Sequence, residues 1–508
     1  MAKSIMLQGT MSGAGKSLMT AALCRILKQD GYRVAPFKSQ NMALNSYVTD
    51  EGLEIGRAQA MQAEAAGVKP SVWMNPILLK PTSDMGSQVV VNGRVFASMR
   101  AVDYFRKKKE MLPVIQSAYE RLAAEYDIVV IEGAGSPVEL NLLKDDIVNM
   151  GMARIADAPV LLVGNIDQGG IFAQMLGTLM LLEEENRARV KGLIVNKFRG
   201  DARLFEDGVQ ILQEKGGVSV LGVVPYLPCD IEEEDSLAER IENQDMPTED
   251  KIDLAVIRLP RMSNFTDFDV FRQYDRAAVR YVKKVAQLGN PDMILVPGTK
   301  NTLADLRWMK ESGMEGAVKK SAAKGIPVFG ICGGYQMMGR KVSDPDGVEE
   351  GGSLAGFGFF DFETVFSGGK VTKQSSGSFA REVTGILRGL SGKDWEGYEI
   401  HHGRMVCSGE LPECGGEGME FTSSGGFCRG NLYGCYIHGI FDAPGVADAV
   451  LMALGERKGQ TMEQEGKRRQ AKAHPLSRAQ YKEEQYDLLA AAVRANIDME
   501  RLYEILGL

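Results

Sequence analysis

A glycine-rich loop near the amino terminus constrains the fold of this chain more than any other sequence feature. A short apolar run, Ser4–Leu7, leads into Gly9-Thr-Met-Ser-Gly-Ala-Gly15-Lys16-Ser17, and a helical pattern follows at Leu18–Asp30. Backbone N–H groups at the start of a helix bind phosphate, and a lysine and a hydroxyl after the last glycine reach the phosphates and Mg²⁺. Thr10 stands where the usual form of this loop has its first glycine, and Gly9 is one residue early. The pattern predicts a nucleotide site made of Gly9, Thr10, Gly13, Gly15, Lys16 and Ser17.

Short apolar runs alternate with longer amphipathic stretches, which favours parallel sheets covered by helices on both faces. The first predicted strand series is Ser4–Leu7, Arg33–Phe37, Asp127–Ile131, Pro159–Val163, Gly192–Val195 and Val218–Val224. The second is Leu254–Leu259, Met293–Val296, Val328–Ile331, Gly356–Phe362, Tyr398–His402 and Leu432–His438. We predict an α/β fold with two three-layer domains, mostly parallel sheets and a helical tail. The expected boundaries are 1–228 for the nucleotide domain, 229–250 for an acidic linker, 251–445 for the second domain and 446–508 for the extension.

Composition and charge exclude several classes of function. The 508 residues carry a formal net charge of −8, so nonspecific attraction to nucleic acid or to an anionic membrane is not expected, and Lys107–Lys109 is interpreted as a solvated face. The seven cysteines are dispersed, so a disulfide framework is not expected. We expect no leader before the first strand and no spanning helix, since no apolar run approaches the ~20 residues that such a helix needs. We expect a cytoplasmic protein with small-molecule partners, and its oligomeric state stays open.

Two further polar residues follow predicted strands of the first series. Glu132 begins Glu132-Gly-Ala-Gly135 after one strand, and Asn196 follows another. Ligands of parallel sheets bind at the carboxyl ends of the strands, and Mg²⁺ prefers hard oxygen ligands. The sequence therefore predicts Ser17 and Glu132 as magnesium ligands and Asn196 beside the adenine. A carboxylate that only caps the following helix is the alternative for Glu132.

A second chemical motif lies in the other half of the chain. Gly330-Ile-Cys332-Gly333-Gly334 ends an apolar strand and begins a helix, which is the cysteine form of a strand–turn–helix nucleophile elbow. The helix start stabilises a thiolate, and the Gly333 N–H can bind an oxyanion. A general base is needed: His438 ends one predicted strand, and His401 and His402 end another. Spacing alone does not decide between these histidines.

Each motif resembles one enzyme family. The first loop and the Glu-Gly-Ala-Gly turn resemble the dethiobiotin-synthetase-like ligases, which convert a carboxylate into an acyl phosphate. The second half resembles the class I (triad) glutamine amidotransferases, in which cysteine forms a glutamyl thioester and releases ammonia. This resemblance implies His438 as the base and Gly298, in Pro297-Gly298-Thr-Lys300, as a second oxyanion donor. The usual glutamate two residues after the histidine is replaced by Ile440, so the group that orients His438 is either missing or replaced, with Asp442 and Glu399 as candidates.

Longer stretches resemble the cobyric acid synthase family across nearly the whole chain. They are Ala35-Pro-Phe-Lys-Ser-Gln-Asn-Met42, Glu54-Ile-Gly-Arg-Ala-Gln59, Asn75-Pro-Ile-Leu-Leu-Lys-Pro81 and Gly397-Tyr-Glu-Ile-His401. The family amidates the b, d, e and g carboxylates of adenosylcobyrinic acid a,c-diamide, with one glutamine and one ATP for each. The resemblance implies ATP and Mg²⁺ without a tightly bound cofactor, glutamine and a corrinoid acid as partners, and substrate contacts by Lys38, Gln40, Asn41, Asp146 and His401.

Several alternatives remain open from the sequence. Asp146 stands where a helix can begin, so a solvated carboxylate at the helix start is the second interpretation of that residue. A related ligase, such as an a,c-diamide synthase or a CTP-synthase-like enzyme, has the same modular plan. A partition-type ATPase with a vestigial second half is also an alternative, but those proteins carry an additional lysine where this chain has Met11.

Overall fold

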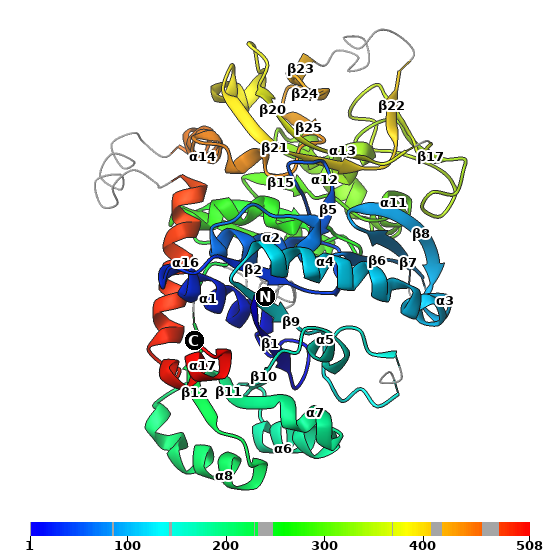
Figure 1. The fold of residues 1–508 in the computed structure, drawn as a ribbon. Helices are drawn as coiled ribbons and strands as arrows, with labels where there is room; N and C mark the ends of the chain where they lie inside the picture. Colours follow the sequence, from blue (N-terminus) through cyan, green and yellow to red (C-terminus); the bar gives the residue numbers. More distant parts are fainter. Residues whose placement is uncertain are drawn as a thin grey trace. The chain divides into compact units, whose positions relative to one another are not determined.

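The computed structural model describes residues 2–83, 86–141, 145–227, 229–231, 247–367, 369–407, 419–459 and 477–508 (Figure 1). The chain divides into two compact units. The first contains residues 1–49, 53–236 and 481–508, and the second contains residues 50–52 and 237–480. Most of the predicted linker, residues 232–246, lies outside the described residues.

The first unit is built on a six-stranded parallel sheet with the order β12-β11-β10-β1-β9-β2. Its strands β1, β9 and β10 are almost entirely buried apolar runs, as expected for a sheet covered on both faces. The bounds are β1 Lys3–Gly9, β2 Val34–Phe37, β9 Ile128–Glu132, β10 Val160–Asn165, β11 Val190–Phe198 and β12 Val220–Pro225. All six predicted strands of the first series are present with shifts at their ends.

Helices cover both faces of this sheet. They are α1 Lys16–Gln29, α2 Arg57–Ala66, α3 Ala101–Lys107, α4 Leu112–Glu125, α5 Met150–Ile155, α6 Ile171–Leu181, α7 Glu184–Arg189 and α8 Glu206–Gly216, with 3₁₀ turns η1 Val72–Met74, η2 Lys108–Met111 and η4 Ala202–Phe205. The end of the chain adds α16 Arg478–Arg494 and α17 Met499–Leu506. Leu489 and Val493 of α16 pack in one apolar cluster with α1 and β1. Residues 481–508 therefore complete the core of the first unit.

A second, smaller sheet lies beyond the end of β2 and was not expected from the sequence. Its order is β3-β6-β7-β8, with β3 Gln40–Met42, β6 Ile77–Ser83, β7 Gly86–Val91 and β8 Arg94–Arg100. A short antiparallel pair, β4 Ser46–Val48 and β5 Glu54–Gly56, precedes α2. Only two residues separate the end of β2 from the start of β3, so this small sheet is attached directly to the carboxyl edge of the large one.

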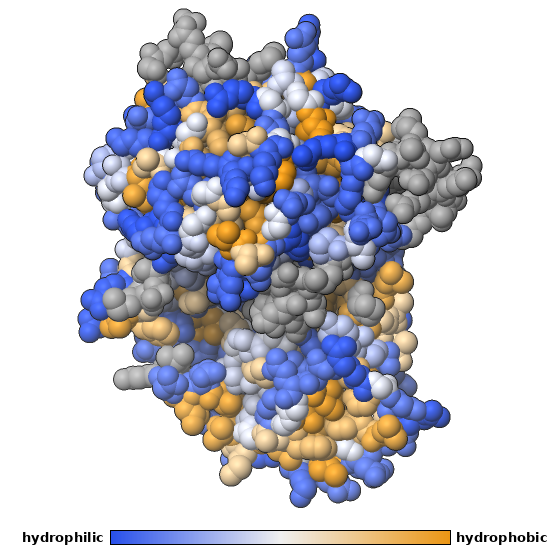
Figure 2. Space-filling model, turned by 180° about the vertical axis from the view of Figure 1, so that it is seen from behind, coloured by the Kyte–Doolittle hydropathy of each residue, from blue (hydrophilic) through white to orange (hydrophobic). Residues whose placement is uncertain are grey.

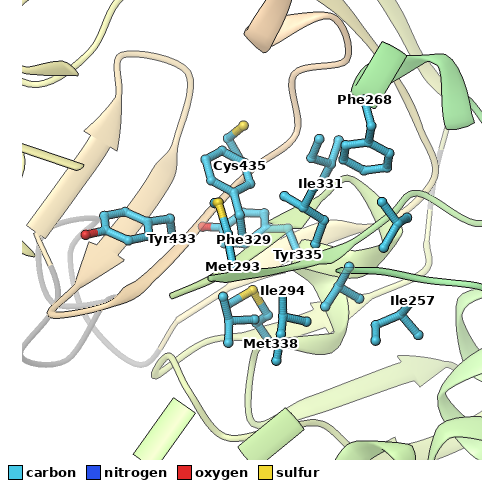
Figure 3. Close-up of a cluster of buried hydrophobic side chains, with 14 of the residues drawn as sticks. Ile257, Phe268, Met293, Ile294, Phe329, Ile331, Tyr335, Met338, Tyr433 and Cys435 are labelled. Carbon is cyan, nitrogen blue, oxygen red and sulfur yellow. The ribbon is translucent and has the colours of Figure 1, made fainter. Parts of the chain in front are cut away.

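The second unit contains a seven-stranded sheet with the order β14-β13-β15-β16-β25-β24-β23. The first five strands run parallel, and the last two pair antiparallel. The bounds are β13 Ile252–Ile257, β14 Ala277–Val282, β15 Met293–Val296, β16 Val328–Ile331, β23 Met419–Thr422, β24 Gly426–Arg429 and β25 Leu432–Cys435. Figure 3 shows Ile294, Phe329 and Ile331 from the central strands gathered in its apolar core. The predicted fold class is confirmed.

The other elements of the second unit surround this sheet. The helices are α10 Val285–Leu288, α11 Thr302–Glu311, α12 Met314–Ala323, α13 Gly333–Met337 and α14 Val446–Arg457, with 3₁₀ turns η5 Phe265–Gln273, η6 Gly385–Leu390 and η8 Ile440–Asp442. Smaller sheets contain β17 Lys341–Asp344, β18 Gly352–Ala355, β19 Glu363–Val365 and β22 Arg404–Val406, and separately β20 Val371–Ser378 and β21 Asp394–His401.

The predicted strand Gly356–Phe362 is wrong. This segment is irregular, and its backbone N–H groups bond to the end of α13: Phe357 donates to Met337 O, and Phe359 donates to Met338 O. Phe357, Phe360 and Phe362 are nevertheless buried. Aromatic content suggested a strand, but Gly358 takes φ +69°, a conformation that breaks an extended run.

On the face drawn in Figure 2, hydrophilic side chains interleave with small groups of apolar ones. Among the residues that the structure describes, none of the helices is both long and apolar enough to cross a lipid bilayer.

Candidate active sites

The glycine-rich loop connects β1 to α1 in the first unit, at the carboxyl edge of its sheet. Gly15 takes φ +89°, and a Cβ there would lie 2.2 Å from the Asn196 Nδ2 atom, so no larger residue fits. That Asn196 amide donates a hydrogen bond of 2.9 Å to the Ala14 carbonyl. The Thr10 hydroxyl donates to Gln174 Oε1 at 3.1 Å. Asn196 thus supports the loop backbone from β11, beside the predicted nucleotide site.

The side chain of Lys16, the first residue of α1, folds back into the glycine-rich loop. Its Nζ atom donates to the Met11 carbonyl at 3.1 Å, and the residue is only 6% exposed. A Cβ on Gly9 would lie 3.0 Å from that same Nζ atom and 2.9 Å from the Met11 carbonyl. Gly9 therefore leaves space for the lysine side chain to fold across the loop. Gly13 also takes a positive φ of 73°.

Glu132 joins the loop to two neighbouring segments. The Ser17 hydroxyl donates to Glu132 Oε1 at 2.8 Å, the Lys38 ammonium contacts the same oxygen at 3.0 Å, and the Gln62 amide donates to Oε2 at 2.5 Å. Glu132 and Lys38 are almost fully buried. Burial by itself would raise the pKa of Glu132, but Lys38, Gln62 and Lys16 together hold it below its usual value. The carboxylate therefore stays ionised.

The oxygen atoms of Ser17 and Glu132 suit a magnesium ion. A hydroxyl and an ionised carboxylate 2.8 Å apart are hard ligands, and Mg²⁺ takes its remaining ligands from phosphate and water. Among the described residues there is no group of three or more His, Cys, Asp or Glu side chains that could hold a metal alone. The donor set therefore fits a nucleotide-borne magnesium ion better than a resident metal centre.

Gln40, Asn41 and Asp146 lie at the same edge of the sheet, after β2 and β9. The Tyr104 hydroxyl donates to Gln40 Oε1 at 2.5 Å, and the buried Asn41 amide donates to Gln59 at 2.9 Å. The Asp146 carboxylate accepts backbone N–H groups of Val148, Asn149 and Gly151, all at 2.9 Å. These three bonds fix the loop that leads into α5, which begins at Met150.

Cys332 lies in the second unit at the turn from β16 to α13. It takes φ 50° and ψ −110°, which is strained for a residue with a side chain and typical of a nucleophile elbow. A Cβ on Gly334 would lie 2.0 Å from the Val296 carbonyl, so the turn requires glycine there. The Cys332 Sγ atom lies 3.7 Å from the Ile400 carbonyl.

His438 is fully buried and pairs with an aspartate that sequence reasoning missed. Its Nδ1 atom lies 2.8 Å from Asp267 Oδ2, and Asp267 Oδ1 accepts the Gly439 N–H. Burial alone would lower the pKa of His438, but attraction to Asp267 and to Cys332 raises it to about 10. At neutral pH the imidazole is therefore protonated and can give a proton to a leaving group.

Asp267 lies in η5, after the carboxyl end of β13, two strands away from the elbow strand β16. Glu132 was selected because ligands bind at the carboxyl ends of parallel strands, and the same rule would have identified Asp267 as a candidate. The two candidates named from the sequence have other partners, and Asp442 lies 3.8 Å from the Arg478 guanidinium. Glu399 contacts Lys373, Ser375 and, at 3.5 Å, His401, and these contacts lower its pKa to about 2 against the opposing effect of burial.

The two predicted oxyanion donors lie close together. A Cβ on Gly333 would lie 2.9 Å from the Thr299 N atom, so the Pro297–Lys300 loop packs directly against the elbow. A Cβ on Gly298 would lie 3.0 Å from His438 Cε1. His401 stacks on Tyr436 with ring centroids 4.1 Å apart and contacts the Gly403 carbonyl through Nδ1. Cys332, His438, Gly298 and Gly333 therefore lie close together in one site.

We expect Asp267→Asn to lower glutaminase kcat/KM about 100-fold or more, because the ring loses the charge that orients it and stabilises its protonated form. The His438 pKa falls when Asp267 is neutral, so the alkaline limb of the pH–rate profile moves to lower pH. The matched control is Asp442→Asn, which removes one of the two carboxylates named from the sequence. An unchanged alkaline limb in Asp267→Asn, or a larger loss in the control, would contradict this assignment.

Comparison with known proteins gives two domain matches. Residues 5–237 match the CobQ/CobB/MinD/ParA nucleotide binding domain, and residues 253–446 match the CobB/CobQ-like glutamine amidotransferase domain. Relatives named cobyric acid synthase align over nearly their whole length. The chain is 54% identical over its full length to one from Lachnoclostridium phytofermentans (99% of that protein) and 51% identical to one from Ruminiclostridium cellulolyticum (97%). It is 46% identical over 99% of its length to one from Photorhabdus laumondii (98%).

Proposed function

The chain belongs to the cobyric acid synthase family, and on that premise we propose that it amidates the b, d, e and g carboxylates of adenosylcobyrinic acid a,c-diamide. It is an ATP-dependent amidoligase of cobalamin biosynthesis with glutamine as nitrogen donor. The observation that carries the proposal is the pair of clusters, Lys16–Ser17–Glu132–Lys38 in one unit and Cys332–His438–Asp267 in the other.

We assign carboxylate activation to the first unit. The carboxylate oxygen attacks the γ-phosphorus of ATP, an acyl phosphate forms, and ADP leaves. Lys16 and Lys38 are suited to stabilise negative charge on the transferred phosphoryl group, because both ammonium groups are buried where electrostatic interactions are strong. Ser17 and Glu132 would hold Mg²⁺, which neutralises phosphate charge when bound. Gly13 and Gly15 allow the backbone to approach the phosphates, and Asn196 supports that loop.

We assign ammonia release to the second unit. The Cys332 thiolate attacks the glutamine side-chain amide, the Gly298 and Gly333 N–H groups stabilise the oxyanion, and protonated His438 gives its proton to departing ammonia. Water then hydrolyses the thioester to glutamate. Ammonia attacks the acyl phosphate, the C–O bond to phosphate breaks, and an amide forms. His401, which stacks on Tyr436, is assigned to glutamine-side positioning rather than proton transfer.

Gln40 and Asn41 are assigned to the acceptor side of the first unit, because they follow Lys38 at the edge where β2 and β9 end. For Asp146 we favour the role of fixing the loop before α5 over magnesium binding, because both carboxylate oxygens already accept backbone N–H groups. We further propose that the ligase domain includes residues 481–508, which pack against α1.

Mass spectrometry of the corrinoid after incubation with the diamide, ATP, Mg²⁺ and glutamine tests the proposed function. Four successive replacements of OH by NH₂ are expected. One site that serves four carboxylates must release the ring and bind it again in another orientation, so partly amidated species are expected to accumulate early. A time course with only substrate and final product would contradict release between steps. Turnover of cobyrinic acid or UTP in place of the diamide would favour a related ligase.

A further inference from the structure

A short basic segment of the first unit has no role in the steps above. Residues 94–109 contain six basic residues and one acidic residue, a formal net charge of +5 in a chain of −8. They form edge strand β8, helix α3 and turn η2. From the sequence Lys107–Lys109 was interpreted as a solvated face, and in the structure the segment that contains it contacts two loops of the first unit.

Two contacts join this segment to the loops that leave the sheet beside Glu132. Tyr104 of α3 is buried, and its hydroxyl donates to Gln40 Oε1, in the segment that follows Lys38. Lys109 of η2 pairs with Asp145 at 2.8 Å, in the loop after β9. Since β2 and β9 are neighbours in the sheet, α3 and η2 bridge the two loops that flank the Lys38–Glu132 pair.

The outer side of the segment is apolar as well as basic. On β8, Ala97 pairs with buried Val89 and Met99 packs against the core, so the alternate residues Phe96, Ser98 and Arg100 face away from it. Phe96 is 56% exposed, and on α3 Val102 is 56% and Phe105 41% exposed. We call Phe96, Arg100, Val102, Phe105, Arg106 and Lys107 the β8–α3 surface.

A surface of this kind needs a ligand that is both apolar and anionic. A group of large apolar side chains exposed together on a protein surface usually marks a binding surface, whereas single exposed apolar side chains are ordinary. The guanidinium and ammonium groups of Arg100, Arg106 and Lys107 attract carboxylates and also steer their approach. A nucleotide has a charged tail but no broad apolar face, whereas a corrinoid acid has a large apolar ring with carboxylates around its edge.

We propose that the β8–α3 surface binds the corrinoid acid, with the apolar side chains against the ring and the basic side chains on carboxylates that are not reacting. This inference rests on the proposed function, since it takes the corrinoid as the acceptor. A surface of broad apolar contacts and mobile cations tolerates several orientations of the ring, which a site that amidates four carboxylates requires.

Two double variants test the surface: Phe96→Ser with Val102→Ser, and Arg106→Glu with Lys107→Glu. Each is expected to raise the KM for the corrinoid at least about tenfold, while the KM for ATP and the glutaminase rate change little. The charge variant should also lose most of the salt dependence of corrinoid binding, because exposed charges act through screened attraction. Matched controls are Leu204→Ser, an 86% exposed residue on η4, and Lys215→Glu on α8.

The outcomes separate this inference from the proposed function. If the unaltered enzyme amidates the diamide but both double variants keep its corrinoid KM within twofold, the β8–α3 surface is not the binding site. An equal rise in the KM for ATP would also overturn the inference. A change in sedimentation with an unchanged corrinoid KM would assign the surface to a second copy of the chain instead. Failure of the unaltered enzyme to amidate the diamide would refute the proposed function itself.

Discussion

Replacement of Cys332 by Ala is expected to abolish amidation with glutamine and to leave amidation with free ammonia intact. The thiolate is the only group in the second unit assigned to attack glutamine, and a methyl group cannot form the thioester. The first unit needs only ammonia, which reaches the acyl phosphate from solution when supplied in excess. The strained backbone at Cys332 accepts alanine with the same strain as cysteine, so the fold is expected to persist.

The measurement is amide formation with either nitrogen source, at several pH values because only unprotonated ammonia reacts. The matched control is Cys428→Ala, which removes another buried thiol from β24 and should keep both activities. Loss of the ammonia-dependent reaction in Cys332→Ala, with the control active, would contradict the division of labour between the two units.

The second large effect is expected from Lys16→Ala, which should stop amidation with glutamine and with ammonia alike. Removing a buried, preorganised charge from a phosphoryl-transfer site costs about 10²–10³-fold in rate, and the loss of phosphate binding adds to this. The Cys332 cluster contains none of the loop residues, so hydrolysis of glutamine is expected to continue in this variant.

Nucleotide binding and amide formation are the two readouts for Lys16→Ala. Lys28→Ala, at the other end of α1, is the matched control and should retain both. If Lys16→Ala keeps ammonia-dependent amidation near the wild-type rate, the loop is not the phosphoryl-transfer site, and the assignment of Lys16 fails.

The two motifs were visible in the sequence because each is local. A phosphate loop and an elbow both need glycine at fixed offsets, since neighbouring atoms lie too close for a Cβ: the Asn196 side chain at Gly15 and the Val296 carbonyl at Gly334. Central parallel strands are continuous apolar runs, so the order of strands and helices along the chain could also be predicted from the sequence. The fold class was predicted for these reasons.

Other features depend on contacts between distant segments. Asp267 reaches His438 across 171 residues of sequence, and the pairing depends on how two loops meet beyond the carboxyl ends of their strands. The packing of Leu489 and Val493 on α1 joins opposite ends of the chain. In the β3-β6-β7-β8 sheet, edge strand β8 exposes Phe96 while Met99 is only partly buried, so the alternation of apolar and polar residues was not recognisable without the neighbouring strands.

On the proposed mechanism, ATP activates a carboxylate as an acyl phosphate before ammonia arrives. This step can be measured by the transfer of ¹⁸O from carboxylate-labelled diamide to inorganic phosphate. One labelled oxygen in phosphate is expected for each amide formed, with either glutamine or ammonia as nitrogen source. Amide formation with unlabelled phosphate would contradict it.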